Sequence, residues 1–175
     1  MADYPAPLAR ERRLADGRTV LIRPIRPDDA KGEREFLERL SQDARRRRFI
    51  KYAHVPDDDL IHFFTHIDYD RHMAFVCEAR NGARSEIVGD ARYTSNADAR
   101  SCELGIVVAD DWHHTGIAQL LMEALTRAAQ ARGFQTMQGV VLRDNRDMLD
   151  FVAALGFESA PSPEDARLVR ITKRL

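Results

Sequence analysis

The stretch from Glu103 to Ala118, ELGIVVADDWHHTGIA, has the residue types and spacing for binding an anion. The apolar, β-branched run from Cys102 to Val108 is typical of a buried strand, and Gly116 stands where the next turn leads into a long amphipathic helix. The first turn of a helix leaves backbone N–H groups without partners and carries the positive end of the helix dipole. Because a glycine lets a phosphate approach the backbone closely, this stretch predicts a phosphate site at the start of the helix.

Three other groups of residues could carry chemistry, but each has a simpler explanation. His62 and His66 have the spacing of two metal ligands on one helical face, yet the His-Glu-x-x-His pattern is missing. The four arginines from Arg45 to Arg48 point in four directions on a helix and have acidic neighbours, which favours a solvated helix over a nucleic-acid site. Cys77 and Cys102 lie in apolar runs, where a free thiol packs as a small hydrophobic side chain. We therefore expect no metal, no nucleic acid and no disulfide.

The composition is that of one folded domain. The chain has 175 residues, of which 44% are hydrophobic and 31% are charged, and its net charge of -1 gives no overall field that would attract nucleic acid or a membrane. No apolar run is as long as a membrane-spanning helix, and the N-terminus lacks the apolar core of a signal peptide, so we expect no membrane partner and a cytoplasmic location. We expect residues 1–10 to form an N-terminal extension and residues 11–175 to form a single domain.

The anion site would be positioned by strands and helices that can be predicted from the sequence pattern. Strand patterns occur at 12–14, 19–25, 72–79, 86–94, 102–108, 135–142 and 167–175. Helix patterns occur at 30–40, around 45–50, at 60–67 after Pro56 and the acidic run 57–59, at 116–132, and from 145 to 156. Asp16-Gly17 and Asn81-Gly82 predict two hairpins. This order predicts a mixed α/β fold with a central mixed sheet of six or seven strands, flanked on both faces by about four helices.

Several segments of the chain match a known family. WHHTGIAQLLMEAL follows an apolar strand, and NRDMLDFVAALGF comes near the end of the chain. Together with the order of elements, these segments resemble the GNAT superfamily of acyl-CoA-dependent N-acetyltransferases. Four further segments, VLIRPIRPDDA, LSQDARRRRF, THIDYDRHMAFV and CELGIVVADDW, are similar to the GNAT domain of bacterial protein lysine acetyltransferases. The resemblance covers most of residues 12–157 and implies the GNAT fold.

The resemblance implies that acetyl-CoA is the acyl donor and that the turn before the long helix holds its pyrophosphate. In the family this turn has the pattern Gln/Arg-x-x-Gly-x-Gly/Ala, which here falls on His113, His114, Thr115, Gly116, Ile117 and Ala118. His113 departs from the usual Gln or Arg, but the backbone contacts need no particular side chain there. Asn145 matches an asparagine that borders the cofactor in similar enzymes, and it could equally cap its helix.

The resemblance also implies direct acetyl transfer to a primary amine. The amine must be neutral to attack, and a lysine amine is almost entirely protonated at neutral pH, so a general base is expected. Glu103 matches the glutamate proposed as this base in the family. A semi-apolar cleft could raise the pKa of its carboxylate, and the alternative is an ordinary strand glutamate that faces solvent. A backbone N–H of Ile106, Val107 or Val108 is expected to polarise the thioester carbonyl. Their strand is expected to part from the strand at 135–142, so that pantetheine can pair in the gap.

The general acid of the family is missing from this sequence. Val152 occupies the position where many members have a tyrosine that protonates the departing thiolate. A thiolate with an ordinary pKa near ~8.5 leaves without much help, so the acid is either unnecessary or replaced by Tyr69 or Tyr93.

The acceptor stays open at this point. The similarity to protein lysine acetyltransferases favours a protein lysine, and a small amine or an amino acid is the alternative. A third possibility is a sensor or interaction module that binds acyl-CoA without transferring the acyl group. We expect a monomer or a homodimer.

Overall fold

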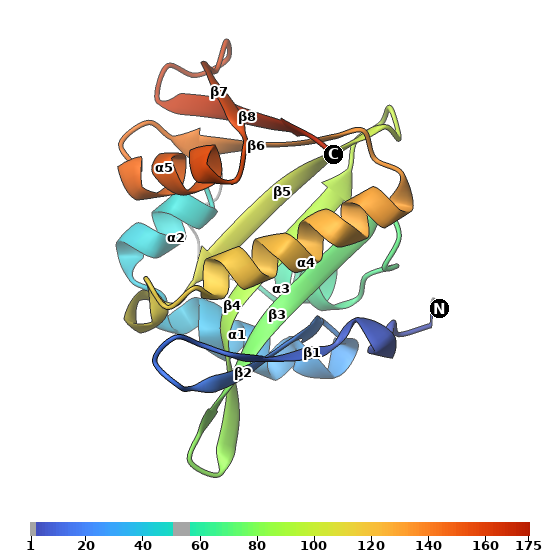
Figure 1. Ribbon diagram of the computed structural model, residues 1–175, viewed down its shortest axis with the longest axis vertical. Coiled ribbons are helices and arrows are strands. Elements are labelled where there is room, and N and C mark those ends of the chain that lie inside the picture. The colour runs from blue at the N-terminus through green and yellow to red at the C-terminus, as the bar shows by residue number, and fades with distance from the viewer. Residues whose placement is uncertain (1–2, 51–56) are drawn as a thin grey trace.

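The computed structural model describes residues 3–50 and 57–175 and is built around one eight-stranded sheet (Figure 1). The strand order is β1-β2-β3-β4-β5-β6-β8-β7, and all neighbours are antiparallel except β5 and β6, which are parallel. The strands are β1 (Arg10–Arg13), β2 (Thr19–Pro24), β3 (His72–Asn81), β4 (Arg84–Ser95), β5 (Ser101–Val108), β6 (Thr136–Leu142), β7 (Glu158–Pro161) and β8 (Leu168–Arg174).

Helices cover both faces of the sheet. They are α1 (Ala30–Arg39), α2 (Gln42–Arg48), α3 (Asp58–Thr65), α4 (Ile117–Arg132) and α5 (Arg146–Ala154), with short 3-10 turns at Ala6–Leu8, Pro27–Asp29 and Asp110–Trp112. Successive side chains of β4 point to opposite faces of the sheet, so their contacts show which helix covers which face. Gly89 lies against Ile117 and Leu121 of α4, whereas Arg92 pairs with Glu33 of α1 on the other face. Figure 1 shows α4 in front of the sheet and α3 behind it.

The helix starts follow the capping residues in the sequence. Ser41 accepts a hydrogen bond from the backbone N–H of Ala44 at the start of α2, and Asp57 accepts one from Leu60 at the start of α3. Such a cap contributes about 1 kcal/mol to helix stability. The acidic first turn expected for α3 is present, while Pro56 lies outside the described residues.

The mixed α/β fold predicted from the sequence is confirmed, but the predicted number of elements is too low. The sheet has eight strands instead of six or seven, because β7 was missed. All four residues of β7 are exposed and the last is Pro161, so the strand has neither alternation nor an apolar run to reveal it. There are also five α-helices in the described ranges instead of about four.

The N-terminal residues pack on the sheet. The Tyr4 hydroxyl donates a hydrogen bond to the carbonyl of Pro24 (3.0 Å), and its ring lies edge-on to Tyr69. The first strand begins at Arg10, inside the stretch expected to be an extension. None of the helices in residues 3–50 and 57–175 is both long and apolar enough to cross a bilayer.

Candidate functional site

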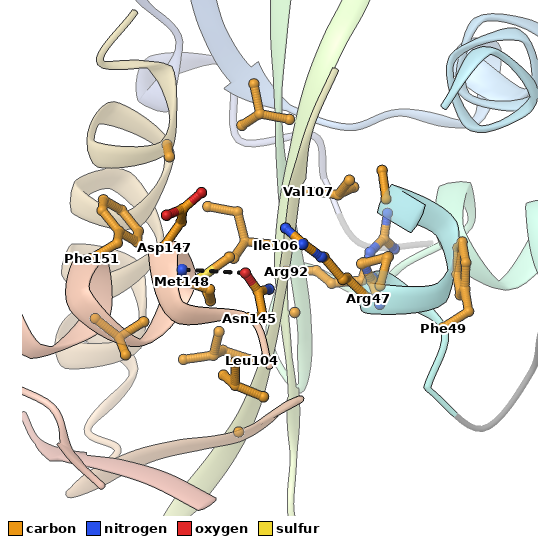
Figure 2. Close-up of a pocket in the computed structure, with 18 of the residues that line it drawn as sticks. Arg47, Phe49, Arg92, Leu104, Ile106, Val107, Asn145, Asp147, Met148 and Phe151 are labelled. Carbon is orange, nitrogen blue, oxygen red and sulfur yellow. Dashed lines mark hydrogen bonds between the residues drawn. The ribbon is translucent and has the colours of Figure 1, made fainter. Parts of the chain in front are cut away.

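A cavity of about 860 Å³ opens beside β5, where the sheet comes apart. In Figure 2, α5 forms the left wall, β5 runs through the middle and α2 forms the right wall. All eleven residues that the sequence predicted for the site line this cavity, namely Glu103, Ile106, Val107, Val108, His113, His114, Thr115, Gly116, Ile117, Ala118 and Asn145. The structure therefore brings the predicted residues together.

The cavity enters the sheet through a gap between β5 and β6. The two strands pair only as far as Glu103 and Gln138, and beyond that point β5 has no partner on its β6 side. Because β5 and β6 are parallel neighbours joined by α4, their separation leaves an unpaired strand edge inside the protein. The parting of these strands expected from the sequence is present.

Alternation decides which backbone groups of β5 face the gap. The N–H of Ala109 donates to the carbonyl of Val88 (2.9 Å), so Val107, two residues earlier, also directs its amide toward β4. The amides of Ile106 and Val108 consequently point into the gap. Of the three residues expected to offer a backbone donor, Val107 lines the cavity but its amide faces the neighbouring strand.

The turn after β5 leaves the first turn of α4 open. Gly116 has a φ of 90°, and a Cβ added there would meet nothing within 4 Å. No side chain in the part of the chain that the structure describes caps the helix, and its first turn has no acidic residue, so no described side chain satisfies the first-turn amides. The arrangement is suited to an anion, because these N–H groups and the helix dipole both favour negative charge.

Side chains of the same turn hold it in place. The Nε2 atom of His113 lies 3.0 Å from the carbonyl oxygen of Val108, so this ring nitrogen carries the proton and donates. Thr115 Oγ1 donates to the carbonyl of Trp112 (2.6 Å), and His114 adopts a left-handed φ of 59°. His113, which replaces the usual Gln or Arg of the resembled pattern, therefore ties the turn to the end of β5.

Glu103 lies at the point where β5 and β6 separate. Its partner across the ladder on β4 is Thr94, and its partner on β6 is Gln138. Its side chain lines the cavity but is exposed, so the carboxylate faces solvent, as in the second alternative, and does not have a semi-apolar surrounding.

The α5 wall contains the predicted cap and no tyrosine. Asn145 is buried, and its Oδ1 accepts a hydrogen bond from the backbone N–H of Met148 (3.4 Å, Figure 2). Val152 lines the cavity. The hydroxyl of Tyr69 donates to Ile25 and that of Tyr93 donates to Asp70, and neither tyrosine lines the cavity. The structure therefore gives no support to Tyr69 or Tyr93 as a replacement for the family's general acid, which leaves the alternative that the acid is unnecessary.

Three arginines that the sequence analysis did not assign to the site line the cavity, and each has an acidic partner. Arg47 pairs with Asp43 (2.9 Å), Arg48 lies 3.8 Å from Asp90, and Arg92 donates from Nε to Asp90 (3.1 Å). No guanidinium among the cavity-lining residues that the structure describes is left without a carboxylate.

Arg48 corrects the expectation of a solvated helix at 45–48. Its side chain is only 13% exposed, and a Cβ added at Gly105 of β5 would lie 3.0 Å from the guanidinium carbon. This distance is tighter than most real Cβ contacts, so a residue with a side chain at this position would require the flexible Arg48 guanidinium to shift. The contact joins α2 and β5, which are far apart in the chain, so one sequence gives no signal for it.

His72 belongs to the same buried cluster. Burial, and then the nearby Arg92, lower the pKa of His72 to about 4, so its ring is neutral at neutral pH. Its Nε2 atom lies 3.3 Å from Nη1 of Arg92 and accepts from it. His62 and His66, the other pair with ligand spacing, stack on each other at 3.9 Å, and no group of three or more potential metal ligands occurs in residues 3–50 and 57–175.

The carboxylate of Glu33, beneath Arg92, should make stability depend on pH. It is completely buried, and neither of its oxygens has a hydrogen-bond partner. Burial, and then the charge of Asp90, raise the pKa of Glu33 to about 8. The folded state then holds this proton more tightly than the unfolded state, so stability is fully present below about pH 4.5 and is lost as the pH rises through about 8.

We expect Glu33→Gln to remove this dependence. In urea unfolding between pH 5 and pH 8, the wild-type free energy of unfolding should fall by up to about 1.4 kcal/mol per pH unit relative to the variant. Glu38→Gln is the matched control, because Glu38 is exposed on the same helix. Equal slopes for the wild type and Glu33→Gln would show that Glu33 is not the group responsible.

Comparison with known proteins agrees with this geometry. The model of the acetyltransferase (GNAT) domain matches residues 19–158 of the chain. The acetyltransferase PA5475 of Pseudomonas aeruginosa is 36% identical over 156 residues, which cover 89% of this chain and 84% of that protein.

Solved structures show the same fold. The GNAT domain of S. lividans PAT matches with a TM-score of 0.88 at 26% identity, covering 99% of this chain and 100% of that chain. A cAMP-binding acyltransferase from Mycobacterium smegmatis matches with a TM-score of 0.64 at 26% identity, covering 95% of this chain and 46% of that chain. The chain thus spans about half the length of the mycobacterial protein.

Proposed function

Because the chain belongs to the GNAT acetyltransferase family, we propose that it transfers the acetyl group of acetyl-CoA to the side-chain amine of a protein lysine. One observation supports this reaction most. The gap in the sheet has the exposed carboxylate of Glu103 at its closed end, and its edge along β5 continues into the open first turn of α4. A base, an unpaired strand edge and an anion site therefore lie along one cavity.

The residues present fit the donor. The amides at the start of α4, within the turn from His113 to Ala118, would hold the pyrophosphate, since a Cβ-free Gly116 leaves them open. The unpaired edge of β5 would pair with the pantetheine arm as a neighbouring strand does, with Asn145 beside it. Acetyl-CoA supplies an activated acyl group, because a thiolate is a good leaving group.

Glu103 would accept the proton of the attacking amine. An exposed carboxylate can pass this proton directly to solvent, so the base is regenerated without a relay. The amides of Ile106 and Val108 point into the gap, where they would donate to the carbonyl oxygen as negative charge develops on it. We propose that the thiolate departs without a general acid, since its ordinary pKa near ~8.5 makes it a stable anion.

Two features favour a protein lysine over a free amino acid. The segments that resemble bacterial protein lysine acetyltransferases include CELGIVVADDW, which contains the candidate base. In addition, Arg47, Arg48 and Arg92 are all paired with Asp43 or Asp90, so no cavity-lining arginine in the described residues is free to bind the carboxylate of an amino-acid substrate. A lysine within a protein presents an amine without such a carboxylate.

The test is mass spectrometry of a bacterial protein extract after incubation with the purified chain and isotopically labelled acetyl-CoA. We expect labelled acetyl groups on protein lysines, and we expect none with the Gly116→Val variant, whose donor site is blocked. Labelling confined to small amines would overturn the lysine assignment. Binding of acetyl-CoA without labelling of any amine would instead identify a sensor or interaction module.

A further inference from the structure

A row of residues crosses three strands on the face of the sheet that carries Glu103. His72 of β3 pairs with Thr94 of β4, and Thr94 pairs with Glu103 of β5. Paired residues in neighbouring strands point to the same face, and neighbouring strands lie about 4.8 Å apart, so the row spans about 10 Å. Exposure increases along it, since His72 is buried, Thr94 is half-buried and Glu103 is exposed.

Phe63 of α3 closes the far end of this row. Its ring centre lies 4.8 Å from that of His72, and it lines the same cavity as Thr94 and Glu103. The side chain is 51% exposed, and in residues 3–50 and 57–175 Leu8 is the only other large hydrophobic residue with comparable exposure. We call the row together with Phe63 the acceptor trough. Ligand cavities are lined mainly by hydrophobic and aromatic side chains, so an exposed ring in the lining of this cavity can contact a ligand.

The order of apolar and charged groups along the acceptor trough is complementary to that of a lysine side chain. One end offers an apolar ring, the small Thr94 leaves room in the middle, and the other end carries the carboxylate of Glu103. Lysine has the same order, with an apolar stem of four methylenes followed by an amine. The neutral ring of His72 adds no positive charge that would repel the incoming ammonium group.

We infer that the acceptor lysine lies along this trough, with its methylene stem on the ring of Phe63 and its amine at Glu103. The inference rests on the proposed function, because it names how the acceptor of that reaction is held. It assigns Phe63 as an acceptor-binding residue, separate from the donor site at Gly116. A short amine has no stem to reach Phe63, so the ring would discriminate in favour of lysine.

The experiment compares Phe63→Ala with the wild type on two acceptors. One is a short peptide with a single lysine between glycines, and the other is ethylamine, which lacks a long stem. We expect kcat/KM for the peptide to fall about tenfold, mainly through KM, since most of one aromatic contact is lost. For ethylamine the change should stay within about twofold, and the Kd of acetyl-CoA should not change. Phe63→Leu, which keeps an apolar contact, should recover most of the peptide activity.

Leu8→Ala is the matched control, because Leu8 is similarly exposed but does not line the cavity. Equal peptide kinetics for Phe63→Ala and the wild type would overturn the inference while leaving the proposed function intact. An equal fall in kcat/KM for the peptide and for ethylamine would also overturn it. Phe63 would then be needed for the structure of the whole site and not for contact with the lysine stem. If the wild-type protein binds acetyl-CoA but acetylates neither acceptor, the proposed function itself fails, and the inference fails with it.

Discussion

Replacing Glu103 by glutamine is expected to lower kcat/KM for amine acceptors by between about 100-fold and 10,000-fold, the range over which a positioned general base acts. Glutamine keeps the shape of the side chain but cannot accept the amine proton. The Glu103 side chain is exposed and forms no ion pair in the described residues, so stability should stay within about 0.5 kcal/mol of the wild type. The measurement is steady-state kinetics with saturating acetyl-CoA, combined with the Kd of acetyl-CoA from calorimetry, which should be unchanged.

Glu158→Gln provides the control for this substitution. Glu158 is also an exposed glutamate on a strand, but it lies on β7 and does not line the cavity. Its variant should keep wild-type kinetics. Unchanged turnover in Glu103→Gln with a good amine acceptor would rule out Glu103 as the base.

The second large effect is expected at the donor site. Gly116→Val should weaken acetyl-CoA binding about 100-fold or more, because a branched side chain would stand over the first-turn amides of α4 and remove charge-assisted hydrogen bonds. The φ of 90° adds backbone strain of about 1–2 kcal/mol in the variant. Binding is measured by calorimetry, and stability by thermal unfolding.

Gly133→Val separates strain from ligand binding. Gly133 ends the same helix with a φ of 89°, and a Cβ added there also meets nothing within 4 Å. Both variants should therefore lose similar stability, and only Gly116→Val should lose affinity for acetyl-CoA. A similar loss of affinity in both would mean that the weaker binding reflects a general loosening of α4.

Much of the fold could be predicted from the sequence because it depends on local patterns. The two hairpins predicted from Asp16-Gly17 and Asn81-Gly82 both form, although the second turn is at residues 82–83 because Asn81 still pairs with Arg84, and the caps at Ser41 and Asp57 begin helices. Alternation and helical spacing involve residues that are close in the chain, so one sequence is sufficient to read them. The strand β7 is not predictable in this way, because its four residues are all exposed and end in proline, so they show no alternation of apolar and polar side chains.

The sequence also located the part of the site that lies on one continuous segment. Glu103, the strand edge after it and the turn at Gly116 are all within sixteen residues, and all of them line the cavity. Their roles in catalysis and donor binding stay predictions. The strand-to-helix pattern identified the turn at Gly116, because such a turn leaves the first amides of the helix unpaired, whereas Glu103 was indicated by the resemblance to the family.

Only the tertiary structure could decide what surrounds this segment. The ladder register directs the amides of Ile106 and Val108 into the gap, and it places His72, Thr94 and Glu103 in one row. The helices α2 and α3 then bring Arg48 and Phe63 onto that face from distant parts of the chain. These contacts depend on strand register and helix packing, which are set by the whole core, whereas the capping and periodicity that one sequence reveals are set by neighbours within a few residues.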